Sequence, residues 1–137
     1  MLVHGTAADH TRWAPVMPAL EERFTVLAVD RRGRGASGDA DDYAIEREFE
    51  DVAAVADGAG EATTVLGHSY GAGCALEAAL LTASVARLVL YEPSLGVVAA
   101  REELVARLES LLEAGERDEL LVYFMAESRA RRPSRSR

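Results

Sequence analysis

Short apolar runs alternate with segments of helical periodicity along the first ninety residues of the chain. One run ends at Val3, and the others cover residues 25–29, 62–66 and 86–91. Each has the length and composition of a strand that is buried on both faces, as in a parallel sheet. The pattern therefore predicts an α/β fold with about four parallel strands. We expect their spatial order to be second, first, third, fourth.

The segments between these runs favour helices and one loop. Residues 11–22 predict a helix with two prolines in its first turn, where the amide donors are unpaired in any helix. Residues 43–56 predict an amphipathic helix, and residues 72–81 predict a helix of small residues that can pack closely on the sheet. Residues 31–42, rich in glycine and aspartate, predict a loop.

The pattern changes after the fourth predicted strand. Residues 97–114 and 116–126 each carry an apolar stripe at helical spacing. The remaining residues have no apolar periodicity and many arginines, which is typical of a disordered tail. We therefore expect a core over residues 1–96, a helical pair over residues 97–127 and a disordered tail over residues 128–137.

Composition narrows the class of protein and its compartment. The 137 residues, 49% of them hydrophobic, fit one globular domain. The net charge of −8 argues against nucleic acids and anionic membranes as partners. No apolar run approaches the ~20 residues of a membrane span, and no basic segment leads an apolar signal core. The single cysteine, Cys74, excludes an intramolecular disulfide and favours a cytoplasmic location.

The pentapeptide Gly67-His68-Ser69-Tyr70-Gly71 lies between a predicted strand and a predicted helix of small residues. A serine at the tip of a sharp strand-to-helix turn holds its hydroxyl clear of the backbone, and its neighbours must be small because strand and helix nearly touch. Ser69 is therefore a candidate nucleophile, and the helix N-terminus beside it favours a developing negative charge. The alternative is that Ser69 is a small turn residue that merely permits tight packing.

Two further motifs follow predicted strands: His4-Gly5-Thr6, and the segment D-R-R-G-R-G-A-S-G over residues 30–38. Together with the pentapeptide, in this order, they resemble the α/β-hydrolase superfamily, most closely its small bacterial serine esterases and cofactor-free haloperoxidase-like members. The resemblance covers residues 1–127. It implies a nucleophilic serine, an acid and a histidine in that chain order, with a backbone oxyanion hole.

The resemblance also implies missing parts. In the family, two strands precede the first motif, and two later strands carry the acid and the histidine. Neither pair has a counterpart here, so the chain resembles a partial hydrolase fold that is truncated at both ends. The helical pair of residues 97–127 resembles the family's lid. Both edges of the sheet would be exposed, and we expect self-association through them.

The resemblance assigns roles to the residues around Ser69. The backbone amides of Thr6 and Tyr70 would bind the oxyanion of the tetrahedral intermediate, a contact worth ~3 kcal/mol per donor. His4 would order the oxyanion turn by hydrogen bonding. Gly5 adjoins the same turn, and His68 adjoins Ser69. We expect His4, Gly5 and His68 to lie on the substrate-binding side of the site.

The sequence does not decide which residue would act as the general base. His68 directly precedes Ser69, and its side chain should point to the opposite face of the strand. With His4 in the oxyanion turn, His10 is the one histidine with a route to Ser69; the alternative is a solvated loop residue. Glu92 ends the fourth predicted strand and is a candidate acid, or else part of a turn leading into the lid.

Other polar residues have structural interpretations. Asp30 should pin its loop by hydrogen bonds. Arg31, Arg32 and Arg34 are expected to pair with acids of residues 39–42 rather than to bind an anion. No cluster of His, Cys, Asp and Glu has metal-ligand spacing, and neither a metal nor a cofactor is expected.

The leading hypothesis is hydrolysis of a small ester or similar acyl substrate through an acyl-enzyme at Ser69. A perhydrolase would use the same site. The alternative is a catalytically inactive fragment or a binding module, because loss of the triad histidine leaves only ~10³–10⁴-fold catalysis over water.

Overall fold

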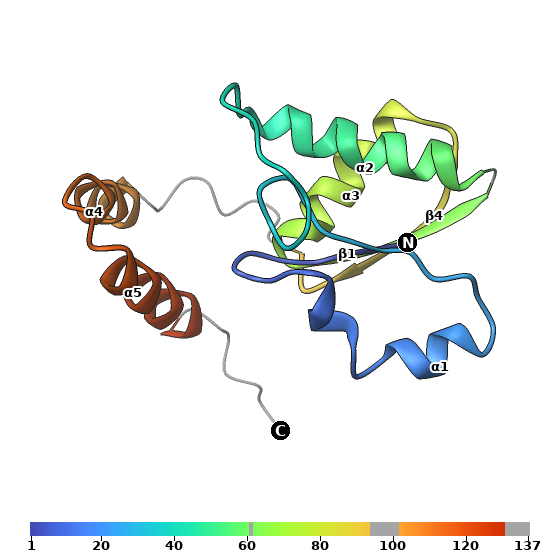
Figure 1. Ribbon diagram of the computed structural model, residues 1–137, viewed down its shortest axis with the longest axis horizontal. Coiled ribbons are helices and arrows are strands. Elements are labelled where there is room, and N and C mark those ends of the chain that lie inside the picture. Colours follow the sequence, from blue (N-terminus) through green and yellow to red (C-terminus); the bar gives the residue numbers. More distant parts are fainter. Residues whose placement is uncertain (61, 94–101, 131–137) are drawn as a thin grey trace. The chain divides into compact units, whose positions relative to one another are not determined.

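The computed structural model describes residues 1–60, 62–93 and 102–130 (Figure 1). The chain divides into two compact units, Met1–Leu95 and Gly96–Arg137. The first unit holds the sheet and the three sequence motifs, and the second holds two helices.

Four parallel strands form one sheet in the first unit, in the predicted order β2-β1-β3-β4. They are β1 (Leu2–Val3), β2 (Ala28–Val29), β3 (Thr63–His68) and β4 (Val85–Tyr91). In register, Val3 lies between Val29 and Gly67. The loops that follow β1, β2 and β3 therefore leave the same edge of the sheet side by side.

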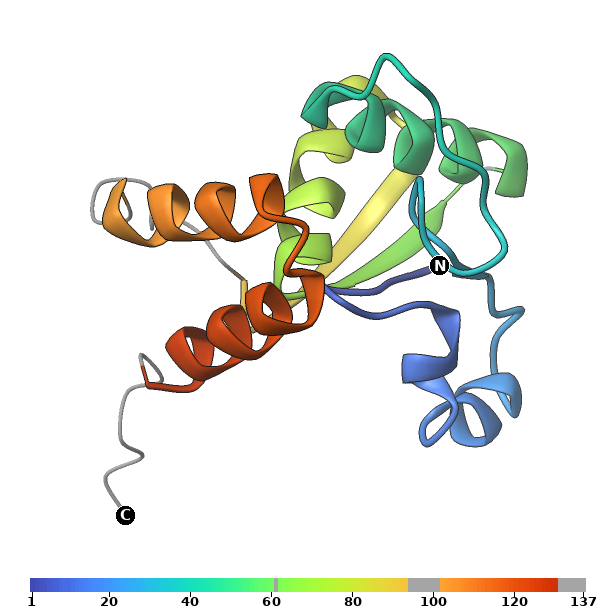
Figure 2. The same cartoon turned by 60° about the vertical axis from the view of Figure 1, so that its left-hand side comes forward.

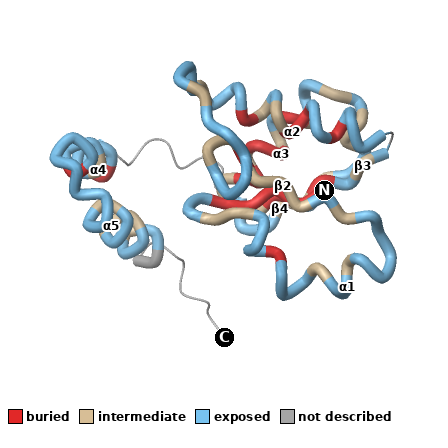
Figure 3. Tube along the Cα trace, viewed as in Figure 1, coloured by how far each residue is buried: buried red, intermediate tan, exposed pale blue. Residues whose placement is uncertain are grey.

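Two helices cover one face of this sheet, α2 (Ile45–Ala59) and α3 (Tyr70–Leu81), while α1 (Met17–Glu21) lies on the other side (Figure 1 and Figure 2). The core between helices and sheet is made of small and β-branched residues: Val3, Val52, Ala56, Val65, Cys74, Ala75 and Ala78, all buried. Figure 3 shows this burial concentrated in α2, α3 and the central strands. Small residues in α3 let the helix axis approach the sheet closely.

Two predicted elements differ from the observed ones. The helix expected over residues 11–22 is a 3₁₀ turn, η1 (His10–Trp13), followed by the short α1. Pro15 separates them, because it has no N–H to continue the hydrogen bonding and its ring clashes with the preceding turn. The strand expected over residues 25–29 is only Ala28–Val29, since β1 offers just two residues for pairing.

The second unit consists of α4 (Glu102–Glu113) and α5 (Arg117–Ala130). Gly115, between the two predicted helices, follows the end of α4 with φ +74°, and the N–H of Glu116 donates to Leu111 O. The predicted start of this helical pair, residues 97–101, lies outside the described residues. Helix α5 runs to Ala130, three residues into the segment predicted as a tail, and residues 131–137 also lie outside the description.

Candidate active site

Ser69 lies at a sharp turn between β3 and α3. Its backbone has φ 53° and ψ −118°, a conformation that residues other than glycine rarely adopt. Two hydrogen bonds fix the turn: Ser69 N–H donates to Tyr91 O over 2.9 Å, and Ala72 N–H donates to Ser69 O over 3.0 Å. The strained serine at a strand-to-helix turn is the local geometry expected from the sequence.

The glycines of the pentapeptide are required by backbone contacts. A Cβ on Gly67 would lie 2.5 Å from Ala72 Cα, within the first turn of α3. A Cβ on Gly71 would lie 2.6 Å from Val3 O of β1 and would also collide with His4 O. Strand and helix backbones therefore touch here, as the small residues predicted, and β1 is held directly against the start of α3.

The loop after β1 lies against Ser69. A Cβ on Gly5 would be 3.1 Å from both Ser69 Cβ and the Nδ1 of His68. Ala7, two residues on, has φ 52°, so the loop turns sharply away from the serine. The register of β1 with β3 thus brings Gly5 beside Ser69.

His4 is fully buried and uses both ring nitrogens. The Arg31 N–H can only donate, so Nε2 of His4 is the acceptor of their 3.1 Å bond. Nδ1 therefore carries the proton and donates to Gly5 O over 2.9 Å. Burial lowers the pKa of His4 and keeps it neutral. This histidine orders the loop and has no nitrogen left to take a proton from Ser69.

Arg31 extends from the end of β2 underneath the same loop. It is buried and donates to His4 O (3.0 Å) and Gly5 O (3.1 Å). It also pairs with the buried Glu48 of α2, and its guanidinium carbon lies 4.6 Å from the centre of the Tyr70 ring. The prediction that this arginine pairs with acids of residues 39–42 is wrong, because the chain turns Arg31 inward beneath α2.

Glu48 was missed by the sequence reasoning. Its side chain is 4% exposed and also accepts hydrogen bonds from the hydroxyls of Tyr43 (2.6 Å) and Tyr70 (3.3 Å). The available signal was its position: Glu48 lies four residues before Val52, on the apolar stripe of the amphipathic helix. A lone acid on an apolar stripe needs a buried partner.

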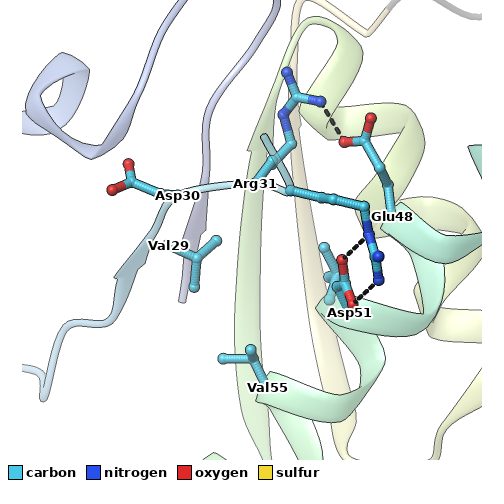
Figure 4. Close-up of a pocket in the computed structure, with 8 residues that line it drawn as sticks. Val29, Asp30, Arg31, Glu48, Asp51 and Val55 are labelled. Carbon is cyan, nitrogen blue, oxygen red and sulfur yellow. Dashed lines mark hydrogen bonds and ion pairs between the residues drawn. The ribbon is translucent and has the colours of Figure 1, made fainter. Parts of the chain in front are cut away.

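The neighbouring arginine also pairs with α2 rather than with residues 39–42. Arg32 donates twice to Asp51, over 2.9 and 2.8 Å, in a partly exposed ion pair, while Arg34 donates to Gly33 O. Figure 4 shows both ion pairs around a cavity of about 30 Å³ between β2 and α2. This cavity has room for water but not for an acyl substrate.

His10 is held by Asp30. The imidazole Nδ1 lies 2.9 Å from both carboxylate oxygens, and the His10 N–H donates over 2.7 Å. Ala36 N–H also donates to Asp30, and these donors lower the pKa of the carboxyl to about 2. The predicted structural role of Asp30, pinning its loop, agrees with these bonds. His10 keeps only Nε2 to accept a proton.

Asp9, His10 and Asp30 place potential metal-ligand atoms within 4.8 Å of one another. Asp9 already accepts from the N–H and the hydroxyl of Thr11, over 2.8 and 2.5 Å. The Asp30 oxygens are likewise in use. These hydrogen bonds account for the cluster without a metal ion.

His68 lies among aromatic side chains. Its ring stacks on Tyr91 with centroids 5.3 Å apart, and the buried Trp13 lies edge-on at 6.5 Å. Glu92, with φ 48°, places a carboxylate oxygen 4.0 Å from His68 Nε2. The structure therefore brings Glu92 to His68. The contact of Trp13 with His68 was not foreseen from the sequence, in which Trp13 has the character of a core residue.

Comparison with known proteins gives a consistent result. The family model described as the alpha/beta hydrolase family matches residues 1–136. An alpha/beta hydrolase from Sphaerobacter thermophilus superposes with a TM-score of 0.82 at 42% identity, over 93% of this chain and 51% of that one. An N-formylmaleamic acid deformylase from Pseudomonas putida gives a TM-score of 0.63 at 31% identity, over 83% and 48%.

An uncharacterized protein of Mycobacterium tuberculosis is 36% identical over 81% of this chain and 33% of its own length. The chain thus spans a third of that relative and about half of the two solved relatives. No helix within the described ranges is long and apolar enough to cross a membrane. With the family model matching almost its full length, the chain belongs to the alpha/beta hydrolase family.

Proposed function

We propose that this chain carries the nucleophile and the oxyanion hole of a serine hydrolase that acts on a small ester or similar acyl substrate. The observation that carries the proposal is the strained Ser69 at the elbow, with Gly5 packed against it. A turn that costs free energy and holds a serine beside backbone amides favours nucleophilic catalysis.

In the proposed reaction, Ser69 Oγ attacks the acyl carbonyl carbon and its proton passes to a base. The N–H groups of Thr6 and Tyr70 donate to the oxyanion of the tetrahedral intermediate. Collapse of the intermediate breaks the bond to the leaving group, which takes up the proton, and water then releases the acyl group from Ser69. Haloperoxidase-like perhydrolysis would begin from the same acyl-enzyme. No metal or cofactor is needed.

Within the described residues, the proposed site has no clear general base for Ser69. His4 has both ring nitrogens engaged, and His10 has its Nδ1 bound to Asp30. His68 directly precedes Ser69 on the chain, and its Nε2 lies 4.0 Å from a carboxylate oxygen of Glu92. We therefore expect the chain by itself to be an impaired hydrolase, with Glu92 as the candidate acid and no triad histidine supplied by the described residues. The second candidate is an inactive fragment or binding module. It is favoured by the hydrogen bonds that engage both ring nitrogens of His4 and the Nδ1 of His10.

The remaining proposals concern partners and location. The charge of −8 favours a small-molecule substrate over nucleic acid or an anionic membrane, and we place the protein in the cytoplasm. β2 and β4 are the edge strands of the described sheet. Unpaired strand edges favour self-association. A dependence of the hydrodynamic size on protein concentration would support it.

A fluorophosphonate probe tests whether Ser69 is activated, because it phosphonylates an activated serine much faster than an ordinary hydroxyl group. We expect slow labelling of the native chain and none of Ser69→Ala. Ser110→Ala, on an exposed position of α4, is the matched control and should label like the native chain. A folded native sample that takes up no label would refute the hydrolase proposal and favour the binding module.

A further inference from the structure

We infer that Arg31 is a positioning residue of the oxyanion hole, acting through the Gly5–Thr6 peptide and the Tyr70 side chain. The inference rests on the proposed function, in which Thr6 and Tyr70 supply the two oxyanion donors. Arg31 is the side chain that contacts both of these donor segments.

The first contact controls the Thr6 amide. Arg31 Nη2 donates to Gly5 O over 3.1 Å, and its Nε donates to His4 O over 3.0 Å. The Gly5 carbonyl and the Thr6 N–H belong to one planar trans peptide, so they point in opposite directions. A bond that fixes the carbonyl therefore fixes the direction of the amide. A cation bound to the carbonyl oxygen also makes the N–H a stronger donor, since linked hydrogen bonds polarise one another.

The second contact concerns Tyr70. The guanidinium carbon of Arg31 lies 4.6 Å from the ring centre, within the range of a cation–π interaction. The Tyr70 hydroxyl donates to Glu48 over 3.3 Å, and Glu48 also pairs with Arg31. One buried ion pair thus holds the side chain of the residue whose N–H is the second donor.

A purely structural role does not require this arrangement. Buried ion pairs are often no more stabilising than apolar side chains of similar volume. The loop after β2, which carries Arg31, is already tied to α2 by the more exposed pair of Arg32 and Asp51. What Arg31 adds is a set of donors aimed at two carbonyl groups of the oxyanion loop, which no apolar residue could supply.

The test compares two double variants of the ¹⁵N-labelled chain by NMR. Arg31→Met/Glu48→Gln removes both charges of the buried pair, so that no lone carboxylate is left in the core. Arg32→Met/Asp51→Asn removes the neighbouring pair as a matched control. We expect the Thr6 and Tyr70 amide resonances to show the largest displacements in the first variant and to stay in place in the second. Glu48→Gln alone keeps Arg31 and should leave the Thr6 resonance close to its native position.

Labelling by the fluorophosphonate probe gives the functional readout. The rate should fall about 10-fold or more in Arg31→Met/Glu48→Gln, a loss smaller than the ~10²–10³-fold effect of deleting an oxyanion donor. It should be unchanged in Arg32→Met/Asp51→Asn. A folded Arg31→Met/Glu48→Gln variant with an unmoved Thr6 amide would overturn the inference. A native chain that does not label would refute the proposed function, while the NMR comparison would still decide the role of Arg31.

Discussion

Substituting Gly71 by alanine should destabilise the protein severely, because the added methyl group meets backbone and not side chain. The new Cβ would lie 2.6 Å from Val3 O and would collide with His4 O, whereas real Cβ contacts stay beyond 3.0 Å. Both oxygens belong to the β1 segment, which is held between β2 and β3 and cannot move aside. We expect a loss of about 3 kcal/mol or more in the free energy of unfolding, at the upper end of overpacking effects.

Gly73 provides the matched control, since it lies in the same helix with no atom within 4 Å of an added Cβ. Gly73→Ala should raise the free energy of unfolding by about 0.5–1 kcal/mol through helix propensity alone. Urea unfolding followed by circular dichroism measures both variants. Equal stabilities of Gly71→Ala and Gly73→Ala would refute the close contact between β1 and α3 on which the elbow depends.

Three further predictions concern buried or hydrogen-bonded charges. Arg31→Met alone should lower the free energy of unfolding by about 3–5 kcal/mol, because it leaves the Glu48 carboxylate buried without a cationic partner. Adding Glu48→Gln should recover most of the loss, and equal unfolding midpoints of the two variants would contradict this. The pKa of Asp30, about 2, lies below its unfolded value near 3.9. The contribution of Asp30 to the free energy of unfolding is therefore complete above pH ~4 and is lost as the pH falls toward 2. Asp30→Asn should reduce this dependence on acid pH, as measured by urea unfolding at several pH values. Burial raises the pKa of Cys74 to about 12, so a disulfide reagent at pH 8 should react only after unfolding, and fast reaction with the folded chain would contradict its burial.

The sheet and the elbow could be predicted from the sequence because they depend on local signals. Strands were recognised as short β-branched runs, and the turn at Ser69 was recognised by its flanking small residues. The close backbone contacts at Gly67 and Gly71 explain why this pentapeptide indicates a sharp turn: a side chain at either position would collide with the backbone.

The partners of charged side chains could not be predicted in the same way. The acids of residues 39–42 are closer in sequence to Arg31 than Glu48 is, yet the fold turns Arg31 beneath α2. Which acid an arginine meets depends on where its loop leaves the sheet, and this is a property of the assembled layers. The two short helical turns before β2 differ from the expected single helix because Pro15 interrupts it.

The most direct test of the account is to identify the residue that becomes acylated. The chain contains no lysine, so acyl transfer to side-chain amines cannot obscure the result. After incubation with an activated acetate ester, peptide mass spectrometry should find one acetyl group on Ser69, and none on that peptide in Ser69→Ala. An acetyl group found only elsewhere on the folded chain, or none at all, would contradict a nucleophilic role for Ser69.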